Sequence, residues 1–500
     1  MAAMCRVHVA AFASFARSAA RFAVLGAGLA AGLVGPAAAA STLPAEALRA
    51  LQHAGIAPQA ISVVVAEVDS GREVLRWQDR VARNPASLAK LLVSAAALER
   101  LGPAWRWTTP VWLAGPVRDG VLEGSVYIKG SGDPELVLER VWLLLRRLQQ
   151  YGVHDIRGDI VLDQGAFAAA AVPPGEFDGE PLRPYNVQPA ALLFNFRSVL
   201  YTFVPDGAAG VAHVLVEPRL DGTPVQSTVP LSAGPCQDWR GALKASFEPA
   251  GTRFAGSYAQ ACGESVWPVA DPQPATYEAR LLATLWRQMG GRLQGSVRTG
   301  AAPREASSSF ELLSPALAAT LRDMNKYSNN LMAQQLLLTL ALQAAPGTPA
   351  TLEAGRDGLV HWLAQQGGGG DEVVIDNASG LSRHTRISAS RLAQVLLNAY
   401  AGPSMSELMS SLPIQGLDGT LRRSRDVPPG RAHLKTGSLR DVAGLAGYVL
   451  ADSGRRYVLV AIVNHPRAPE ARPALDALVR WTMRDAPAHR AGLRPPAARP

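Results

Sequence analysis

The chain has 500 residues, of which 48% are hydrophobic, so it can form one large core and at least one smaller domain. Its net charge of +8 is modest, and no lysine and arginine stripe interleaved with aromatic residues is present, which argues against a nucleic-acid partner. Only five of the 49 basic residues are lysines, so each lysine position is informative.

Residues 1–40 have the pattern of a cleaved secretory signal peptide. Three arginines and no acid accompany an apolar run at residues 22–34, and Ala38 and Ala40 suit signal peptidase. An uncleaved membrane anchor is the alternative, but the run is shorter than the roughly 20 residues that span a bilayer. We therefore predict a periplasmic protein of net charge +5 after cleavage, with at most peripheral membrane association.

Two cysteines, Cys236 and Cys262, remain after the leader is removed. Exported proteins meet an oxidising compartment, where thiols pair. We predict one disulfide between them, against the alternative of two free buried thiols. The nine histidines show no metal-ligand spacing, so neither a metal nor a cofactor is expected.

The two ends of the chain predict one antiparallel sheet. Residues 61–67 are β-branched and apolar, and a turn at 69–71 leads to a return strand at 73–75. Residues 444–450 and 457–463 form a second apolar pair, preceded by a strand that contains Lys435. Residues 470–484 have helical spacing and predict a terminal helix against this sheet.

The first motif with chemical meaning is Ser87-Leu88-Ala89-Lys90. The sequence predicts Ser87 at a helix N-terminus and Lys90 one turn later on the same face. A desolvated lysine can lose its proton and act as a base, whereas arginine cannot. A serine cap with a solvated lysine is the ordinary explanation of such a pair. The rarity of lysine and the apolar residues 91–93 favour a buried nucleophile with its base.

The middle of the chain changes character twice. Residues 103–268 contain short strands with many glycines, prolines and turn signals, and we interpret them as an inserted β-rich region. Residues 312–400 have a helical pattern with a glycine break at 367–370, and they predict a helical layer beside the sheet. Residues 41–102 and 269–485 are therefore expected to form one domain, and residues 486–500 a disordered tail.

Two further motifs follow within these elements. Ser328-Asn329-Asn330 falls between helical segments, where a hydroxyl can relay a proton and an amide can position a substrate. Lys435-Thr436-Gly437 falls on a strand, where the lysine and threonine can bind a carboxylate and the glycine admits a substrate backbone. The backbone amides of Ser87 and Ser438 could form an oxyanion hole. Each motif alone fits a helix cap or an ordinary edge strand.

Together and in this order, the three motifs are those of penicillin-binding proteins and class A β-lactamases. The chain resembles the class C low-molecular-mass penicillin-binding proteins, the D-alanyl-D-alanine carboxypeptidases and endopeptidases of peptidoglycan. The further stretches that carry this resemblance are Gly132-Asp133-Pro134 with Leu136, Gly158 to Phe167, Tyr185 to Asn195, Asp376 to Arg383, Leu412 to Leu421, and Leu445-Ala446-Gly447-Tyr448.

The resemblance implies a mixed α/β (α+β) fold, the penicillin-recognising serine DD-peptidase/β-lactamase-like domain, with two inserted domains. It implies that Ser87 attacks the penultimate D-alanine carbonyl and that Lys90 is the base. Ser328 and Asn330 would assist, and Lys435 with Thr436 would bind the terminal carboxylate. Peptidoglycan peptides and β-lactam antibiotics, which acylate family members, are the expected partners.

Three further residues are candidates for recognising the peptide side chain. By resemblance, Asp163 and Arg383 line the pocket for that side chain. Arg440 stands where relatives often have glutamine, which changes the expected side-chain preference. Two rival functions remain, a β-lactamase and a non-catalytic penicillin-binding sensor of the cell wall. A β-lactamase needs an added base for deacylation, which nothing in the sequence marks, and the intact motifs argue against a sensor.

Overall fold

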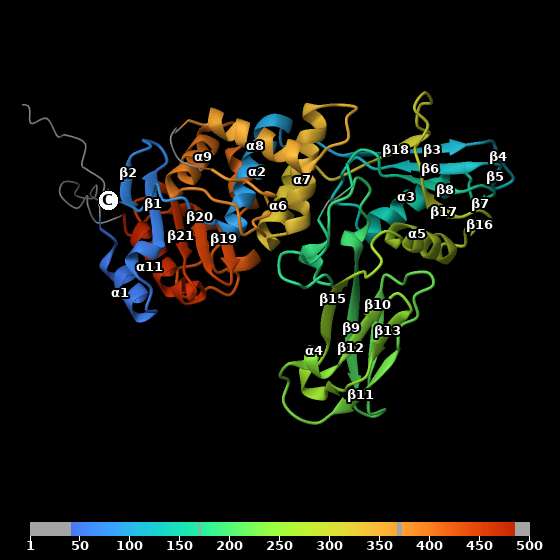
Figure 1. The fold of residues 1–500 in the computed structure, drawn as a ribbon, viewed down its shortest axis with the longest axis horizontal. Coiled ribbons are helices and arrows are strands. Elements are labelled where there is room, and N and C mark those ends of the chain that lie inside the picture. Colours follow the sequence, from blue (N-terminus) through green and yellow to red (C-terminus); the bar gives the residue numbers. More distant parts are fainter. Residues whose placement is uncertain (1–41, 170–171, 368–372, 486–500) are drawn as a thin grey trace, which may run out of the picture. The chain divides into compact units, whose positions relative to one another are not determined.

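A computed structural model describes residues 42–169, 172–367 and 373–485 (Figure 1). The predicted signal peptide, the predicted disordered tail and most of the predicted glycine break lie outside these ranges. Within the described ranges, no helix is both long and apolar enough to cross a bilayer.

Both ends of the chain contribute to one five-stranded antiparallel sheet, as predicted. Its order is β19-β20-β21-β1-β2, and β1 pairs with β21 from Ile61 opposite Val463 to Glu67 opposite Tyr457. Figure 1 shows the blue N-terminal strands beside the orange and red C-terminal ones. The strands are β1 (Ile61–Glu67), β2 (Glu73–Trp77), β19 (Ala432–Leu439), β20 (Val442–Leu450) and β21 (Arg456–Asn464).

Helices cover both faces of this sheet, which explains why its strands are almost continuously apolar. Along β1, Val63 and Val65 join the core that contains α1 and α11, while Val64 and Ala66 join the core of the helical layer. α1 spans Ala45–His53, and the predicted terminal helix is α11 (Arg472–Met483). The helical layer contains α2 (Lys90–Leu101), α6 (Leu317–Tyr327), α7 (Asn330–Ala344), α8 (Leu352–Gln365), α9 (Ala389–Ala401) and α10 (Met405–Ser411).

One boundary of the predicted helical segment is wrong. The segment was expected to begin at Leu312, but Leu312 lies in β18 (Phe310–Leu313) and the first helix begins at Leu317. β18 pairs with β3 in the inserted region. The apolar side chains of 310–313 therefore serve a sheet instead of a helix face.

The first part of the predicted inserted region, together with residues that follow residue 268, forms two sheets and two amphipathic helices. The sheet orders are β17-β8-β6-β3-β18 and β16-β7-β5-β4. The elements are β3 (Thr108–Ala114), β4 (Val117–Arg118), β5 (Val121–Leu122), β6 (Ser125–Lys129), α3 (Leu138–Gln150), β7 (Asp155–Ile156), β8 (Ile160–Asp163), α5 (Tyr277–Gln288), β16 (Arg292–Leu293) and β17 (Val297–Thr299).

The second part of the inserted region is β-rich and holds the disulfide. Its main sheet has the order β14-β11-β10-β9-β15, and β12 and β13 form a separate hairpin. Cys236 and Cys262 are bonded, as predicted. The elements are β9 (Ser198–Asp206), β10 (Val211–Glu217), β11 (Thr228–Ser232), α4 (Trp239–Ala242), β12 (Ala245–Glu248), β13 (Gly251–Phe254), β14 (Tyr258–Ala259) and β15 (Ser265–Ala270).

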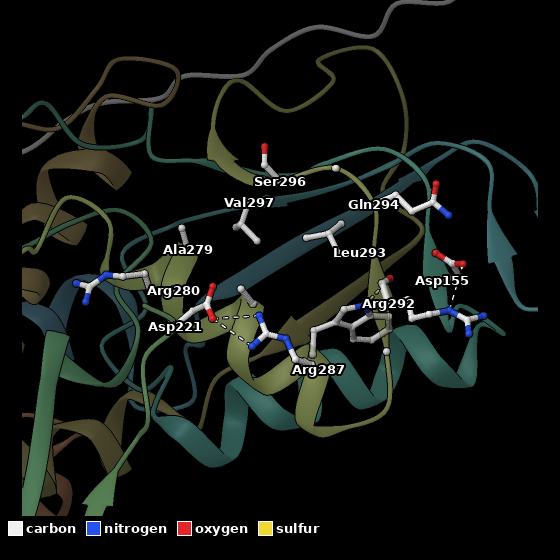
Figure 2. A pocket seen from close by; sticks show the side chains of 14 residues that line it. Asp155, Asp221, Ala279, Arg280, Arg287, Arg292, Leu293, Gln294, Ser296 and Val297 are labelled. Carbon is white, nitrogen blue, oxygen red and sulfur yellow. Dashed lines mark hydrogen bonds and ion pairs between the residues drawn. The ribbon is translucent and has the colours of Figure 1, made fainter. Parts of the chain in front are cut away.

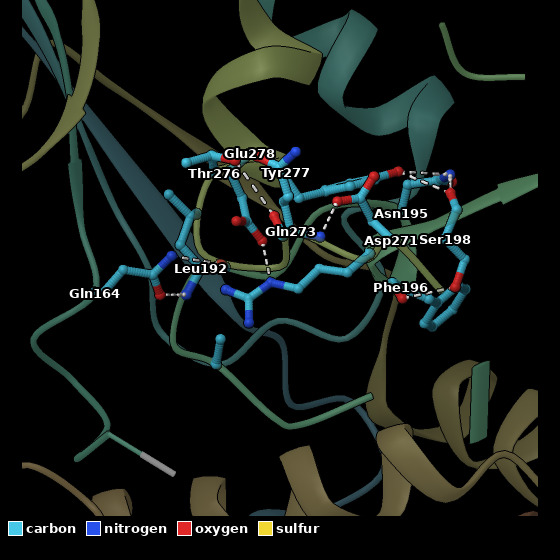
Figure 3. A network of polar contacts seen from close by, with 12 residues as sticks. Gln164, Leu192, Asn195, Phe196, Ser198, Asp271, Gln273, Thr276, Tyr277 and Glu278 are labelled. Atoms are coloured by element: carbon cyan, nitrogen blue, oxygen red, sulfur yellow. Dashed lines mark hydrogen bonds and ion pairs between the residues drawn. The ribbon is translucent and has the colours of Figure 1, made fainter. Parts of the chain in front are cut away.

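A buried polar network joins α5 to the start of β9 (Figure 3). The Tyr277 hydroxyl donates to the Ser198 carbonyl at 2.8 Å, and Arg197 Nε donates to Glu278 Oε1 at 2.7 Å. The Arg197 and Glu278 side chains are only 14% and 4% exposed. Each charged group therefore needs the other to offset the free-energy cost of removing it from water. This network fixes α5 to the second part of the inserted region.

The extent of the inserted region stays a prediction, but strand pairing supports a later end than residue 268. β16, β17 and β18 come after that residue, yet they pair with β7, β8 and β3. The side chains of α5 pack in the same core as those strands. We infer that the inserted region ends near residue 313.

Candidate active site

Ser87 lies on a short 3-10 turn (Ala86–Ala89) that leads directly into α2. The turn is held from outside: the Asn84 side chain accepts the Ala86 N–H at 2.9 Å and donates to the Ser382 carbonyl at 2.9 Å. Ala86 has a φ of +47°, a conformation that costs energy for a residue with a side chain. The surrounding contacts therefore hold Ser87 in a conformation that the local sequence alone would not favour.

Lys90 is completely buried and reaches Ser87. Its Nζ lies 3.0 Å from Ser87 Oγ and 2.7 Å from Asn330 Oδ1, and it also contacts the Ser379 carbonyl oxygen. Burial lowers the pKa of Lys90 well below its usual value, and the charge of Lys435 lowers it further. A neutral amine has two N–H groups and one lone pair. Asn330 and Ser379 can accept the two N–H groups, which leaves the lone pair for the Ser87 hydroxyl proton.

A second buried lysine faces the same place from the sheet. Lys435 on β19 has no exposed surface, and its Nζ donates to Ser328 Oγ at 2.8 Å and to the Thr436 carbonyl at 3.0 Å. Burial lowers the pKa of Lys435 to about 7. Ser328 ends α6 with a φ of +58°, and α7 begins two residues later at Asn330. The joint between two helices thus presents Ser328 to one lysine and Asn330 to the other.

The glycine of the third motif has a structural reason different from the one inferred from the sequence. A Cβ at Gly437 would come within 2.6 Å of the Pro85 carbonyl oxygen and 3.1 Å of Leu88 Cγ. Gly437 therefore lets β19 approach the turn that carries Ser87. From the sequence, this glycine was expected to let a substrate backbone approach the strand. Together with the hydrogen bonds of the two lysines described above, this close approach brings five motif residues into one cluster: Ser87, Lys90, Ser328, Asn330 and Lys435.

The open edge of β19 lies beside this cluster. β19 is the first strand of the sheet, and Leu434 N–H donates on its outer side to the Pro413 carbonyl at 2.9 Å. Because backbone groups alternate along a strand, the N–H groups of Thr436 and Ser438 point to the same side. Ser438 is exposed. An extended chain could therefore pair with β19 next to Ser87.

The three predicted side-chain recognition residues have different surroundings. The Arg383 guanidinium lies 4.4 Å from the centre of the Phe177 ring and bonds Asp441 Oδ1 at 3.1 Å. It lines a cavity of about 340 Å³ together with Phe177, Tyr185 and His384. Arg440 is exposed, and in the described part of the chain it has no hydrogen-bond or ion-pair partner.

Asp163 has both carboxylate oxygens engaged within the inserted region. They accept the N–H groups of Gly165 at 2.8 Å and Ala302 at 2.9 Å. These two hydrogen bonds give Asp163 a structural role at the end of β8 that needs no contact with a substrate. A role in side-chain recognition stays a prediction for all three residues.

Sequence reasoning missed several residues that shape the site. Ser379 contributes a backbone carbonyl, which no side-chain pattern reveals. Gly380 has a φ of +81°, and a Cβ there would come within 1.9 Å of the Ala86 carbonyl oxygen. The Asn-Ala-Ser-Gly sequence at 377–380 is a turn signal that could have pointed to this close approach. Asn84 also shapes the site, because its side chain holds the Ser87 turn.

A larger cavity, of about 850 Å³, lies in the inserted region between α5 and residues 291–297 (Figure 2). None of the motif residues is among those that line it. Its arginines are already neutralised: Arg287 bonds Asp221 at 3.1 Å, and Arg292 lies 3.4 Å from Asp155. Size alone therefore does not make it the reactive site.

Three features of this site define the class of penicillin-recognising serine hydrolases. They are a serine bonded to a buried lysine, a Ser-x-Asn turn between two helices, and a second buried lysine on the edge strand of a sheet. Within that class, the model of the D-Ala-D-Ala carboxypeptidase 3 (S13) family matches residues 46–485. The chain belongs to this family, and it is a serine-type D-Ala-D-Ala carboxypeptidase.

Two relatives that are named D-alanyl-D-alanine carboxypeptidases agree with this assignment. The chain is 25% identical over 398 residues to a D-alanyl-D-alanine carboxypeptidase of Haemophilus influenzae, covering 76% of this chain and 80% of that protein. It is 26% identical over 452 residues to the D-alanyl-D-alanine carboxypeptidase of Actinomadura sp. strain R39, covering 86% and 82%.

Solved structures support the fold. The crystal structure of penicillin binding protein 4 from H. influenzae superposes with a TM-score of 0.72 at 22% identity, covering 88% of this chain and 100% of that one. The same protein complexed with a β-lactam gives a TM-score of 0.67 at 22% identity, covering 88% of this chain and 99% of that one.

Proposed function

We propose that the protein removes the terminal D-alanine of peptidoglycan stem peptides and cleaves D-alanyl cross-links through an acyl-enzyme on Ser87. The observation that carries the proposal is the set of contacts made by Lys90 Nζ, which joins the Ser87 hydroxyl, Asn330 and Ser379 inside a buried site. We further propose that the leader directs the protein to the periplasm, where this substrate lies.

In acylation, Lys90 takes the Ser87 proton as Oγ attacks the carbonyl carbon of the penultimate D-alanine. The backbone N–H groups of Ser87 and Ser438 would stabilise the oxyanion, which is usually a large contribution in acyl transfer. The outward direction of the Ser438 N–H supports this part of the proposal. Collapse of the tetrahedral intermediate breaks the peptide bond, and the leaving amine takes a proton through Lys90 or Ser328.

The leaving D-alanine carries a carboxylate, for which Lys435 and Thr436 are the proposed partners. Both belong to β19, the edge strand of the sheet, and a charged ammonium with a hydroxyl suits a carboxylate. Water then attacks the acyl-enzyme and regenerates Ser87. A β-lactam would acylate Ser87 by the same steps, because its strained amide replaces the D-alanyl-D-alanine bond. The β-lactam complex of the H. influenzae relative supports this expectation.

Incubation of the purified protein with pentapeptide and cross-linked muropeptides tests the proposal. We expect free D-alanine and conversion of cross-linked dimers to monomers, both measured by liquid chromatography with mass spectrometry. Protein first treated with benzylpenicillin should carry one covalent adduct and release neither product at the initial rate. Equal product from treated and untreated protein would contradict the assignment, and rapid sustained penicillin turnover would favour a β-lactamase.

The two lysines predict a bell-shaped pH dependence of kcat/KM. Lys90 must be neutral to act as a base, so activity falls at low pH as Lys90 gains a proton. Lys435 must be charged to bind the carboxylate, and its pKa of about 7 places the alkaline limb near neutral pH. Rates measured up to pH 9 on a peptide with a free terminal carboxylate should fall near pH 7 on the alkaline side, and the acidic limb should lie below that pH.

A thioester substrate whose leaving group lacks a carboxylate serves as the control for the alkaline limb. Its rate should keep the acidic limb and lose the alkaline one, since substrate binding then no longer depends on the charge of Lys435. Loss of that charge leaves Lys90 to be neutralised by burial, which is the larger cause of its lowered pKa. An alkaline limb of equal size for both substrates would rule out this role of Lys435.

A further inference from the structure

A third lysine is buried next to the site, and the reaction described above does not use it. Lys326 is on the last turn of α6, two residues before Ser328, and is 4% exposed. Its Nζ donates to Asp418 Oδ2 at 2.6 Å and to the Leu412 carbonyl at 2.9 Å. A buried ammonium needs such partners, so Lys326 fixes the segment 412–418 to the end of α6.

This ion pair shapes the turn that follows Asp418. The other carboxylate oxygen of Asp418 accepts the Ile414 N–H at 2.7 Å, which closes the loop on itself. Gly419 packs directly on the Lys326 backbone: its φ is +55°, and a Cβ there would come within 2.6 Å of the Lys326 carbonyl oxygen. The next residue, Thr420, is thereby placed beside the third motif.

Thr420 touches the motif through its hydroxyl. Thr436 Oγ1 donates to Thr420 Oγ1 at 2.8 Å, and Thr420 is exposed at this point. A hydroxyl can donate one hydrogen bond and accept two. In this arrangement Thr436 gives its single proton to Thr420, and the Thr420 proton stays free. Because hydroxyl protons rotate, an anionic oxygen in front of the two threonines can accept directly from Thr420, and from Thr436 once the Thr436 proton turns toward it.

We propose that Thr420 is a further residue that binds the terminal carboxylate of the substrate, and that the Lys326–Asp418 ion pair positions it. The proposal rests on the proposed function, since it names a second hydroxyl for the carboxylate that Lys435 and Thr436 bind. Lys326 is a positioning residue: it acts through the turn at 418–419 and reaches the substrate only by way of Thr420.

A purely structural role for this segment makes a different prediction. If Lys326, Asp418 and Thr420 only stabilise the loop, their loss should weaken every ligand of the site equally. If Thr420 binds a carboxylate, its loss should weaken ligands that carry a carboxylate and spare those that do not. A hydrogen bond to a charged group corresponds to roughly tenfold to hundredfold in affinity.

Calorimetric binding to protein with Ser87→Ala, in which no chemistry follows, separates the two cases. The ligands are an N-acyl-D-Ala-D-Ala peptide and its C-terminal amide. Adding Thr420→Val should raise the Kd of the acid peptide about tenfold or more and change that of the amide less than about twofold. Thr299→Val, at an exposed threonine on β17, is the matched control and should change neither.

Equal weakening of both ligands, or none for the acid peptide, would overturn the role of Thr420. Failure of the proposed function has another signature, since the unsubstituted protein would then release no D-alanine. If Ser87→Ala binds no acid peptide although the unsubstituted protein releases D-alanine, only the role of Thr420 is overturned.

A double-mutant cycle tests the positioning role of Lys326. Lys326→Met should produce the same selective loss as Thr420→Val, and the double variant should be no worse than Thr420→Val alone, because both act on one contact. Losses that add in full would refute the positioning role. Thermal melting verifies folding, and Asp418→Asn replaces Lys326→Met if that variant does not fold.

Discussion

Replacement of Lys90 by arginine is expected to abolish acylation of Ser87 by penicillin and release of D-alanine from muropeptides. Arginine keeps its proton at any accessible pH, so it cannot accept the proton of the Ser87 hydroxyl. Loss of a general base alone lowers rates by about 10²- to 10⁴-fold. Mass spectrometry of the penicillin adduct over time measures the rate directly.

Two further variants serve as controls for this experiment. Lys129→Arg changes an exposed lysine on β6 and should acylate like the unsubstituted protein. Lys90→Met removes the amine without adding bulk to the buried site, and it should be as inactive as Lys90→Arg. An acylation rate for both Lys90 variants within tenfold of the unsubstituted protein would exclude Lys90 as the base.

The second large effect is expected for Ser87→Ala, which should form no covalent adduct and release no D-alanine. The bond between Lys90 and Ser87 is lost, but Lys90 keeps Asn330 and the Ser379 carbonyl, so the fold should survive. Non-covalent binding of the peptide should persist because Lys435 and Thr436 are unchanged. Intact-mass spectrometry and D-alanine assays provide the readouts.

Ser410→Ala, at an exposed serine of α10, is the matched control and should retain full activity. Peptide mapping of the penicillin adduct adds a separate test in the unsubstituted protein. An adduct that maps to any residue other than Ser87, or that persists in Ser87→Ala, would contradict the assigned nucleophile.

The sheet could be predicted from the sequence because its strands are long and buried on both faces. Runs such as residues 61–67 and 457–463 are almost wholly apolar, and short turns separate each from its neighbour. The end of the inserted region could not be placed in the same way. β16 and β17 contain two and three residues, too few to show a period, and only their pairing with β7 and β8 reveals where they belong.

The residues of the site also fall into two groups, those that the sequence could reveal and those that it could not. The motif residues could be singled out because their side chains carry chemistry at fixed spacing. The structure brings them together, and their roles stay predictions. The Ser379 carbonyl was not predictable, because a backbone oxygen has no signature in the sequence. Asn84 and Lys326 look like a turn residue and a helix-end cation. Their importance comes from partners such as Ser382 and Asp418, which are far away in the chain.

The pairing of β1 with β21 affects when the protein can become active. Ribosomes make Ser87 early, while β19, β20 and β21 follow it by more than 340 residues. Until they arrive, three of the five strands of the central sheet are missing, and Ser87 has no Lys435 opposite it. An incomplete or prematurely terminated chain therefore carries the nucleophile without the strands that complete its surroundings.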